Sequence, residues 1–449
     1  MCGVSLRIEL HRHIVWPLRG GRAPSCWACN HPREELFPAR PDNVLRRGAG
    51  ELSYNEFYWQ YMHHNWPVII TDVSTDWQCQ QWTSSNVDEG DDNANANTGL
   101  AGAHINFDYL RRRIGDCPVP VADCNATYFN SHAKAELNFH DYLSRWQARI
   151  EGEAEVNSNV ARMKTDDNLY LKDWHLAAQM PSYDFYQVPK YFASDWLNEQ
   201  LMAEKRDDYR FVYMGPKDSW TSYHSDVFGS FSWSTNIVGH KKWLIMPPGE
   251  ELKLSDRLGN LPFSINEQLL DEHKVHYFTI NQTANEAVFV PSGWYHQVWN
   301  LSDTISINHN WFNACNVPMV WRNLLSNLKA VRKEISDCQQ MDNFEAHCQT
   351  MLRASFGINY LDFIELLEFI SARRLAALAD DTRSSSTTTK FLLFDTYKMS
   401  DYHVQHDLEC LRELLTLMLD DPSVQQSPAQ LSERCQRLLS QLAAQKSRI

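Results

Sequence analysis

The chain has 449 residues, 43% of them hydrophobic, and a formal net charge of −14 at pH 7. A surface this acidic repels phosphate backbones, which argues against direct nucleic-acid binding and favours a basic protein or peptide as partner. The 11 cysteines are odd in number and scattered along the chain, which argues against a disulfide framework. No apolar run approaches the roughly 18 residues of a membrane span. These features predict an intracellular protein without a membrane span.

The N-terminal part divides into two predicted regions. Residues 1–48 are rich in Arg, Pro and Gly without a regular period, which predicts a poorly ordered arm. Within it, Cys26 and Cys29 form a C-x-x-C pair, but a zinc site needs about four ligands and no second pair stands at ligand spacing. We interpret the two as free thiols. Residues 49–208 alternate predicted helices and strands, which are expected to flank a central β domain.

Residues 209–315 have a different pattern. Short β-branched and aromatic runs such as SWSTNIVG, KKWLIMPPG and AVFVPSG alternate with Gly, Pro and Asn turns. Seven or eight strands of this kind in so short a segment predict a small antiparallel barrel or jelly roll.

Residues 316–449 are predicted to be helical. Apolar residues step by three and four along the first helix, which is typical of an amphipathic helix. The apolar faces are expected to pack on the barrel or on a second copy of the chain, which would make a homo-oligomer. The stepping residues are Trp321, Leu324, Leu325, Leu328, Val331 and Ile335.

A candidate metal site begins with His224 and Asp226. On a strand, residues two apart point to the same face, so the imidazole and the carboxylate are expected to project together into the barrel. Two His and one carboxylate on one face are the iron(II) ligands of many oxygenases, with open positions for cosubstrate and dioxygen. His296, at the start of a later strand after a Pro–Ser–Gly turn, is the candidate third ligand, although other histidines remain possible partners.

A second candidate residue is Lys241, which begins the strand KKWLIMPP. A lone buried ammonium is costly, and a bound carboxylate such as that of 2-oxoglutarate would satisfy it. The alternative is that Lys241 and Lys242 are both exposed.

The strings YLKDWH, YHSDVFGSFSWSTNIVGHKKW and VFVPSGWYHQVWNL are similar to motifs of the jumonji-C domain and extend the resemblance over residues 50–315. The combination most closely resembles the jumonji-domain-containing protein 4 group. Together with the patterns above, it implies a mainly β fold with appended α. The expected core is a double-stranded β-helix (jelly roll, cupin-like), flanked by N-terminal mixed α/β elements and a C-terminal helical subdomain.

The resemblance also implies roles for residues. The family's iron ligands fall on His224, Asp226 and His296. Its cosubstrate threonine, three positions before the first histidine, falls on Thr221, and its cosubstrate lysine falls on Lys241. The implied cofactors are iron(II), 2-oxoglutarate as cosubstrate and dioxygen.

Further cosubstrate contacts are implied on neighbouring strands, at Tyr170, Asn308 and Asn310. One position departs from the family's pattern, because relatives often carry Asn where this chain has Ser234. Asn236 lies two residues further on and is expected on the same face, so either Ser234 or Asn236 could make the contact that the family's Asn makes.

The implied activity is that of a cytoplasmic dioxygenase that hydroxylates a lysine of the eukaryotic translation release factor and so promotes translation termination. Asp218, Glu250 and Glu251 are candidates to face the ammonium of that lysine. Two other functions stay open: a jumonji-C histone or protein lysine demethylase, and a non-catalytic binding scaffold. Detection of succinate would separate an enzyme from a scaffold.

Overall fold

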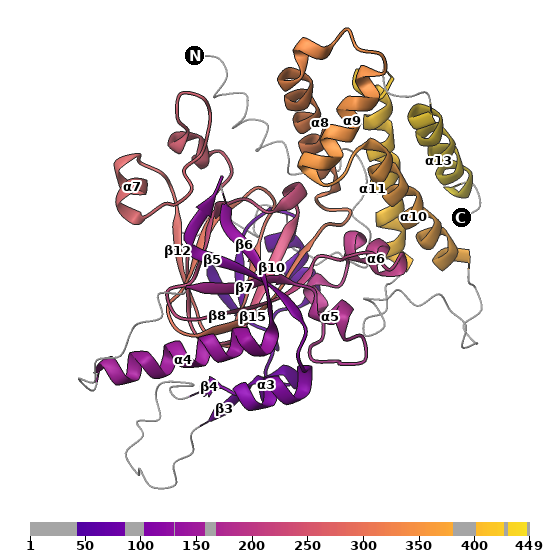
Figure 1. Ribbon diagram of the computed structural model, residues 1–449. Helices are drawn as coiled ribbons and strands as arrows, with labels where there is room; N and C mark the ends of the chain where they lie inside the picture. Colours follow the sequence, from indigo (N-terminus) through magenta and orange to yellow (C-terminus); the bar gives the residue numbers. More distant parts are fainter. Residues whose placement is uncertain are drawn as a thin grey trace.

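The computed structural model describes residues 43–85, 103–129, 131–157, 168–379, 401–425 and 430–446. At its centre, eight consecutive strands are divided between two facing sheets, as the strand pattern predicts (Figure 1). The larger sheet contains the order β13-β10-β15-β8, and the smaller one has the order β12-β11-β14-β9. This is a double-stranded β-helix. Its strands are β8 (Arg210–Gly215), β9 (Trp220–His224), β10 (Phe231–Val238), β11 (Lys241–Met246), β12 (Phe278–Gln282), β13 (Ala287–Val290), β14 (Tyr295–Asn300) and β15 (Thr304–Trp311).

The N-terminal elements extend the larger sheet to nine strands and cover its outer face. Trp233 of β10 points to that outer face and stacks on Phe192, with ring centroids 5.4 Å apart. The Tyr142 hydroxyl of α4 donates to the Met214 carbonyl of β8, which fixes α4 across the sheet. The elements are α2 (Tyr54–Phe57), η1 (Tyr58–Met62), β2 (Val68–Thr71), η2 (Gln78–Trp82), β3 (Thr83–Ser85), β4 (Ala103–Ile105), α3 (Phe107–Ile114), β5 (Pro118–Tyr128), β6 (Ser131–Asn138), α4 (Phe139–Asn157), β7 (Leu169–Trp174), α5 (Leu176–Gln179), η3 (Lys190–Phe192) and α6 (Trp196–Ala203).

The edge of this sheet differs from the sequence expectation. Strand β1, Leu45–Gly48, lies inside the last residues of the predicted arm and pairs in parallel with β2. Its order comes from hydrogen bonds to a distant segment, which a local pattern does not reveal. Residues 1–42, with Cys26 and Cys29, lie outside the described residues.

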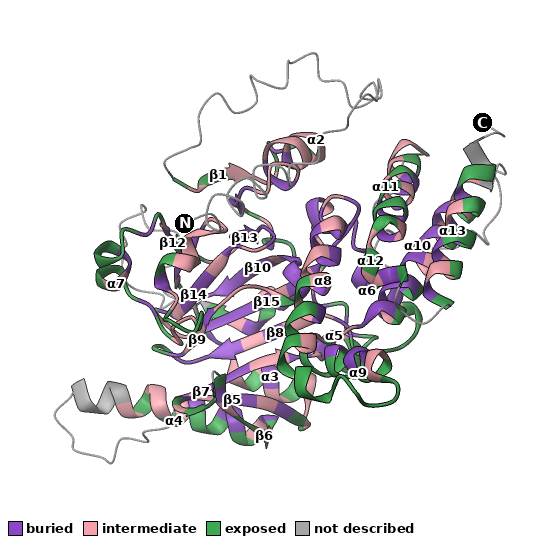
Figure 2. Cartoon of the chain, turned by 90° about the horizontal axis from the view of Figure 1, so that it is seen from above, coloured by how far each residue is buried: buried purple, intermediate pink, exposed green. Residues whose placement is uncertain are grey.

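The C-terminal helices bury their apolar faces within the chain (Figure 2). Trp321, Leu324 and Leu328 of α8 are buried, and the other stepping residues pack against the same cluster as partly buried neighbours. A contact with a second copy of the chain stays a prediction. The helices are α8 (Val317–Glu334), η6 (Ser336–Cys338), α9 (Phe344–Phe356), α10 (Tyr360–Ala379), α11 (Asp401–Asp420), α12 (Pro422–Gln425) and α13 (Gln430–Lys446). Within the described ranges, none of the helices has the length and apolar character needed to cross a membrane.

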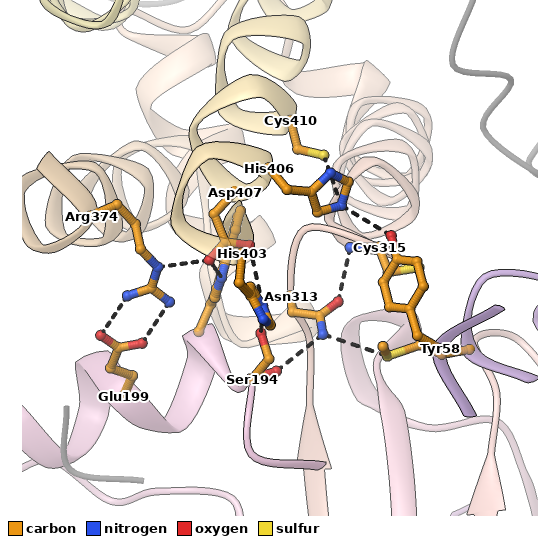
Figure 3. A network of polar contacts seen from close by, with 12 residues as sticks. Tyr58, Ser194, Glu199, Asn313, Cys315, Arg374, His403, His406, Asp407 and Cys410 are labelled. Carbon is orange, nitrogen blue, oxygen red and sulfur yellow. Dashed lines mark hydrogen bonds and ion pairs between the residues drawn. The ribbon is translucent and has the colours of Figure 1, made fainter. Parts of the chain in front are cut away.

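A buried ionic network joins these helices to the rest of the molecule (Figure 3). The Arg374 guanidinium of α10 is fully buried, donates to both carboxylate oxygens of Glu199 on α6 at 2.9 and 3.0 Å, and donates to Asp407 of α11 at 2.7 Å. Next to it, His403 of α11 contacts Ser194, which precedes α6. Because a buried charge without a partner is costly, this network fixes how α6, α10 and α11 pack together.

Candidate metal and cosubstrate site

Three side chains with metal-ligating atoms meet at one end of the barrel. Strand β9 ends at His224, and Asp226 follows with an extended backbone, φ −62° and ψ 149°. His296 of β14 lies directly opposite His224 in the antiparallel pairing of these strands. The ligand atoms of all three lie within 4.8 Å of one another, and in the described part of the chain no other group of three does so.

Backbone carbonyls orient both imidazoles. His224 Nδ1 lies 2.7 Å from the Ser222 carbonyl, and His296 Nδ1 lies 3.0 Å from the Trp294 carbonyl. Because a carbonyl only accepts, each Nδ1 carries the hydrogen and each Nε2 keeps a lone pair for a metal. Burial, together with the neighbouring His296, lowers the pKa of His224 to about 4, so His224 is neutral at pH 7, as a metal ligand must be.

The Asp226 carboxylate is held on both oxygens. Ser232 Oγ of β10 donates to Oδ2 at 2.7 Å, and Asn310 Nδ2 of β15 donates to Oδ1 at 2.8 Å. A carboxylate has about four acceptor positions, so a metal can still bind it. Asn310, which the resemblance assigns to the cosubstrate, contacts this carboxylate, and sequence reasoning missed Ser232 altogether. Two imidazoles and one such carboxylate fit iron(II).

Lys241 lies deeper in the barrel. The residue is 2% exposed, and its Nζ donates to Ser306 Oγ of the facing sheet at 2.7 Å. Lys242 points to the other face and pairs with Glu267 at 3.0 Å. Burial lowers the pKa of Lys241 to about 7, which is the response of an ammonium whose neighbours are neutral. The arrangement fits the far carboxylate of 2-oxoglutarate.

A β-bulge aligns Thr221 with the site. On a regular strand, residues three apart face opposite ways, so Thr221 and His224 would diverge. In β9, however, Thr221 pairs with Val298 while His224 pairs with His296, which places one extra residue on β9. Since Val298 and His296 are two apart on β14, their partners share the inward face.

Tyr170 of β7 is buried beside the Lys241 end of the pocket. It lies next to Ser219, whose Oγ accepts from the Asn300 amide at 2.8 Å, and the Asn300 backbone lies directly opposite Lys241. Gly215 makes room for its ring, because a Cβ there would lie 2.5 Å from a ring carbon of Tyr170. Sequence reasoning missed Asn300, although it lies two residues from Val298 on the same strand face.

The inward face of β10 carries both candidates for the family's Asn position. Ser234 lies opposite Asn308 and Asn236 opposite Ser306 across the β10–β15 pairing. Asn236 Nδ2 donates to the Gly239 carbonyl at 2.7 Å, so its amide supports the turn into β11. Ser234 Oγ is buried without a partner in the described residues. Asn308 donates to Ser306 Oγ at 3.1 Å, next to Lys241.

Comparison with known proteins agrees with this geometry. The JmjC family, described as "JmjC domain, hydroxylase", matches residues 211–311. A Drosophila melanogaster protein named 2-oxoglutarate and iron-dependent oxygenase JMJD4 homolog is 67% identical over 92% of this chain and 96% of its own length. The Homo sapiens oxygenase JMJD4 is 40% identical over 76% of this chain and 79% of its own length. An Arabidopsis thaliana protein named arginine-specific demethylase JMJ20 is 37% identical over 75% of this chain and 71% of its own length. The chain therefore belongs to the JmjC-domain 2-oxoglutarate and iron-dependent oxygenases of the JMJD4 group, enzymes that use iron(II), 2-oxoglutarate and dioxygen.

Proposed function

We propose that this oxygenase is a cytoplasmic protein hydroxylase that adds an oxygen atom to carbon in a lysyl side chain of the eukaryotic translation release factor, and so promotes translation termination. The single observation that carries the proposal is its similarity, over most of the chain, to proteins of the JMJD4 group. The net charge of −14 supports a lysine-bearing protein as partner in preference to nucleic acid.

Each candidate residue has a part in this proposal. His224, Asp226 and His296 would hold the iron through two Nε2 atoms and one carboxylate. Lys241 pairs with the far carboxylate of 2-oxoglutarate. With iron bound, dioxygen would supply both oxygen atoms of the reaction, one entering succinate as 2-oxoglutarate loses carbon dioxide and one added to the substrate carbon.

The remaining polar residues position these groups and line the pocket. Ser232 and Asn310 fix the orientation of the Asp226 carboxylate through the hydrogen bonds described above. Thr221, Tyr170 and Asn308 line the cosubstrate end with hydroxyl and amide groups, alongside Asn236 and Ser234. The barrel's aromatic and aliphatic inward residues exclude water from the reacting atoms.

The test is direct. The enzyme is incubated with iron(II), 2-oxoglutarate and recombinant release factor, and peptides are mapped for a gain of about 16 Da, the mass of one oxygen atom. The expected result is a modified lysine whose oxidation is lost in His224→Ala and Asp226→Ala. Robust oxidation of another protein, without oxidation of the release factor, would discard this substrate and leave the oxygenase intact.

A second candidate function is demethylation, favoured by the name of the Arabidopsis relative, an arginine-specific demethylase. The same oxidative chemistry on an N-methyl carbon gives an unstable product that loses formaldehyde. Release of formaldehyde and loss of a methyl group, without a stable oxygen on carbon, would favour this alternative.

A further inference from the structure

Strand β7 is interrupted by a bulge at the edge of the site. Leu171 pairs with Met214 and Trp174 pairs with Val212, so Lys172 and Asp173 together lie opposite the single residue Tyr213 of β8. Asp173 has a positive φ of 61°, a conformation that a non-glycine residue adopts at a cost. Bulges next to active sites commonly re-aim a side chain, and here the bulge turns a carboxylate toward the inward face.

The Asp173 carboxylate is held in place and charged. The Tyr213 hydroxyl donates to Oδ1 at 2.8 Å, and Lys134 Nζ of β6 donates to Oδ2 at 3.0 Å. Burial on its own would raise the pKa of Asp173, but Lys134, Lys172 and the hydrogen bond from Tyr213 lower it overall. The group is therefore an anion at neutral pH.

Tyr213 connects this carboxylate to the inward face of the barrel. In the β8–β15 pairing, Tyr213 lies opposite Ser306, so its ring is on the inward face. Its pKa is raised well above the usual range by burial first, then by Asp173, with Asp226 adding to the shift. Asp173 thus bonds an inward-facing tyrosine whose backbone lies opposite Ser306, the hydrogen-bond partner of Lys241.

The carboxylate has room for another partner. Tyr213 and Lys134 use two of the roughly four acceptor positions of a carboxylate. The side chains of Lys134 and Asp173 are 62% and 38% exposed, so substrate can reach them from solvent and their ion pair is weak. Lys172, although near, makes no ion pair of its own in the described residues, so Lys134 is the cation that an incoming ammonium would replace.

We propose that Asp173 binds the ammonium group of the target lysyl side chain, which displaces Lys134 and places the reacting carbon over the iron. This inference rests on the proposed lysyl hydroxylation. It also replaces two of the acids suggested by sequence, because Glu250 and Glu251 bond groups of surface loops, namely Lys253, the His276 amide and the Gly249 amide, whereas Asp173 bonds a tyrosine of a barrel strand. Asp218, exposed on the loop before β9, is left as the matched control.

The first experiment compares single variants with the release factor as substrate. Asp173→Asn keeps an acceptor for Tyr213 and tolerates positive φ, so the fold should persist. Loss of a hydrogen bond between charged groups should raise KM for the release factor by about 10- to 100-fold. Succinate formation without protein substrate should not change. Asp218→Asn should leave KM unchanged, and Lys134→Ala should lower it.

The second experiment does not depend on the release factor. Nα-acetyl-lysine methylamide and its norleucine counterpart, which lacks the ammonium, are titrated while succinate formation is measured. In the wild-type enzyme, the lysine probe should change the rate of succinate formation at a concentration at least about tenfold lower than the norleucine probe does. Asp173→Asn should remove that preference.

The outcomes separate the two proposals. Unchanged KM in Asp173→Asn, with the release-factor lysine still oxidised, would overturn the ammonium site and leave the proposed function. A lysine-probe preference that requires Asp173, without release-factor oxidation, would discard that substrate and support the site. If the enzyme shows neither a preference for the lysine probe nor oxidation of the release factor, the ammonium site and the proposed function are both overturned.

Discussion

His224 and His296 lie directly opposite each other on β9 and β14, with ring centroids 4.4 Å apart. With Asp226 they should bind about one iron(II) per chain. Alanine at any of the three should abolish succinate formation while the circular dichroism spectrum stays native. Asp226→Ala should weaken metal binding most, because it removes the only charged ligand. Full activity in any one of these variants would exclude that residue as a ligand.

Asn310 should influence the affinity for iron although it is not a metal ligand. Asn310→Ala removes the donor to Asp226 Oδ1, and loss of such an orienting partner typically weakens metal affinity or activity by about 10- to 100-fold. Iron titration under anaerobic conditions measures this directly. The matched variant is Asn308→Ala, whose side chain bonds Ser306 and not the carboxylate, so it should leave iron affinity close to wild type.

Lys241 and Lys242 provide a paired test of the cosubstrate pocket. Lys241→Ala should raise the KM for 2-oxoglutarate far more than that for the protein substrate, because breaking a buried ion pair on one side costs about 3–5 kcal/mol. Lys242→Ala should change little, since its partner Glu267 is on the outer face. Sensitivity of Lys242 instead of Lys241 would contradict the placement of the pocket.

Lys241 should also make stability depend on pH. Its pKa is lowered to about 7 in the folded chain, whereas an unfolded lysine titrates near about 10.4. Between these values the unfolded state binds more protons, so stability without 2-oxoglutarate should rise as pH increases from about 7 to about 10. Urea denaturation at several pH values measures the slope. Lys241→Met should flatten it, and an unchanged slope in that variant would refute the assignment.

The buried network predicts a purely structural effect. Arg374→Met leaves Glu199 and Asp407 buried with less compensation, so the free energy of unfolding should fall by about 3–5 kcal/mol. Arg437→Met is the control, because Arg437 is 64% exposed and its contact with Glu368 is 3.4 Å long. Chemical denaturation of both variants should show a large loss only for Arg374. Equal losses would mean that burial of the charge is not what matters.

The sequence predicts those features of the site that follow from the two-residue alternation of side chains along a strand. His224 and Asp226 share a face because they are two apart, and the neighbours Lys241 and Lys242 diverge for the same reason. The hydrogen bonds from Ser232 and Asn310 to Asp226 were missed, because they join β10 and β15 to a residue beyond the end of β9, and no local pattern contains that arrangement.

Two bulges illustrate the same limit. Thr221 reaches the inward face only because β9 holds an extra residue. The resemblance implied a cosubstrate role for Thr221 but did not explain its orientation. The bulge of β7 was not predicted, because the string YLKDWH reads as a regular strand. Strand β1 was likewise hidden, since its order depends on pairing with β2.

We propose that this enzyme hydroxylates carbon in a lysyl side chain of the release factor. The most direct measurement is mass spectrometry of the release factor after reaction under ¹⁸O-labelled dioxygen, with succinate quantified in parallel. We predict one labelled oxygen on a single lysine, formed with succinate and absent in Asp226→Ala. Formaldehyde with loss of a methyl group, or succinate formation with an unmodified release factor, would contradict the claim.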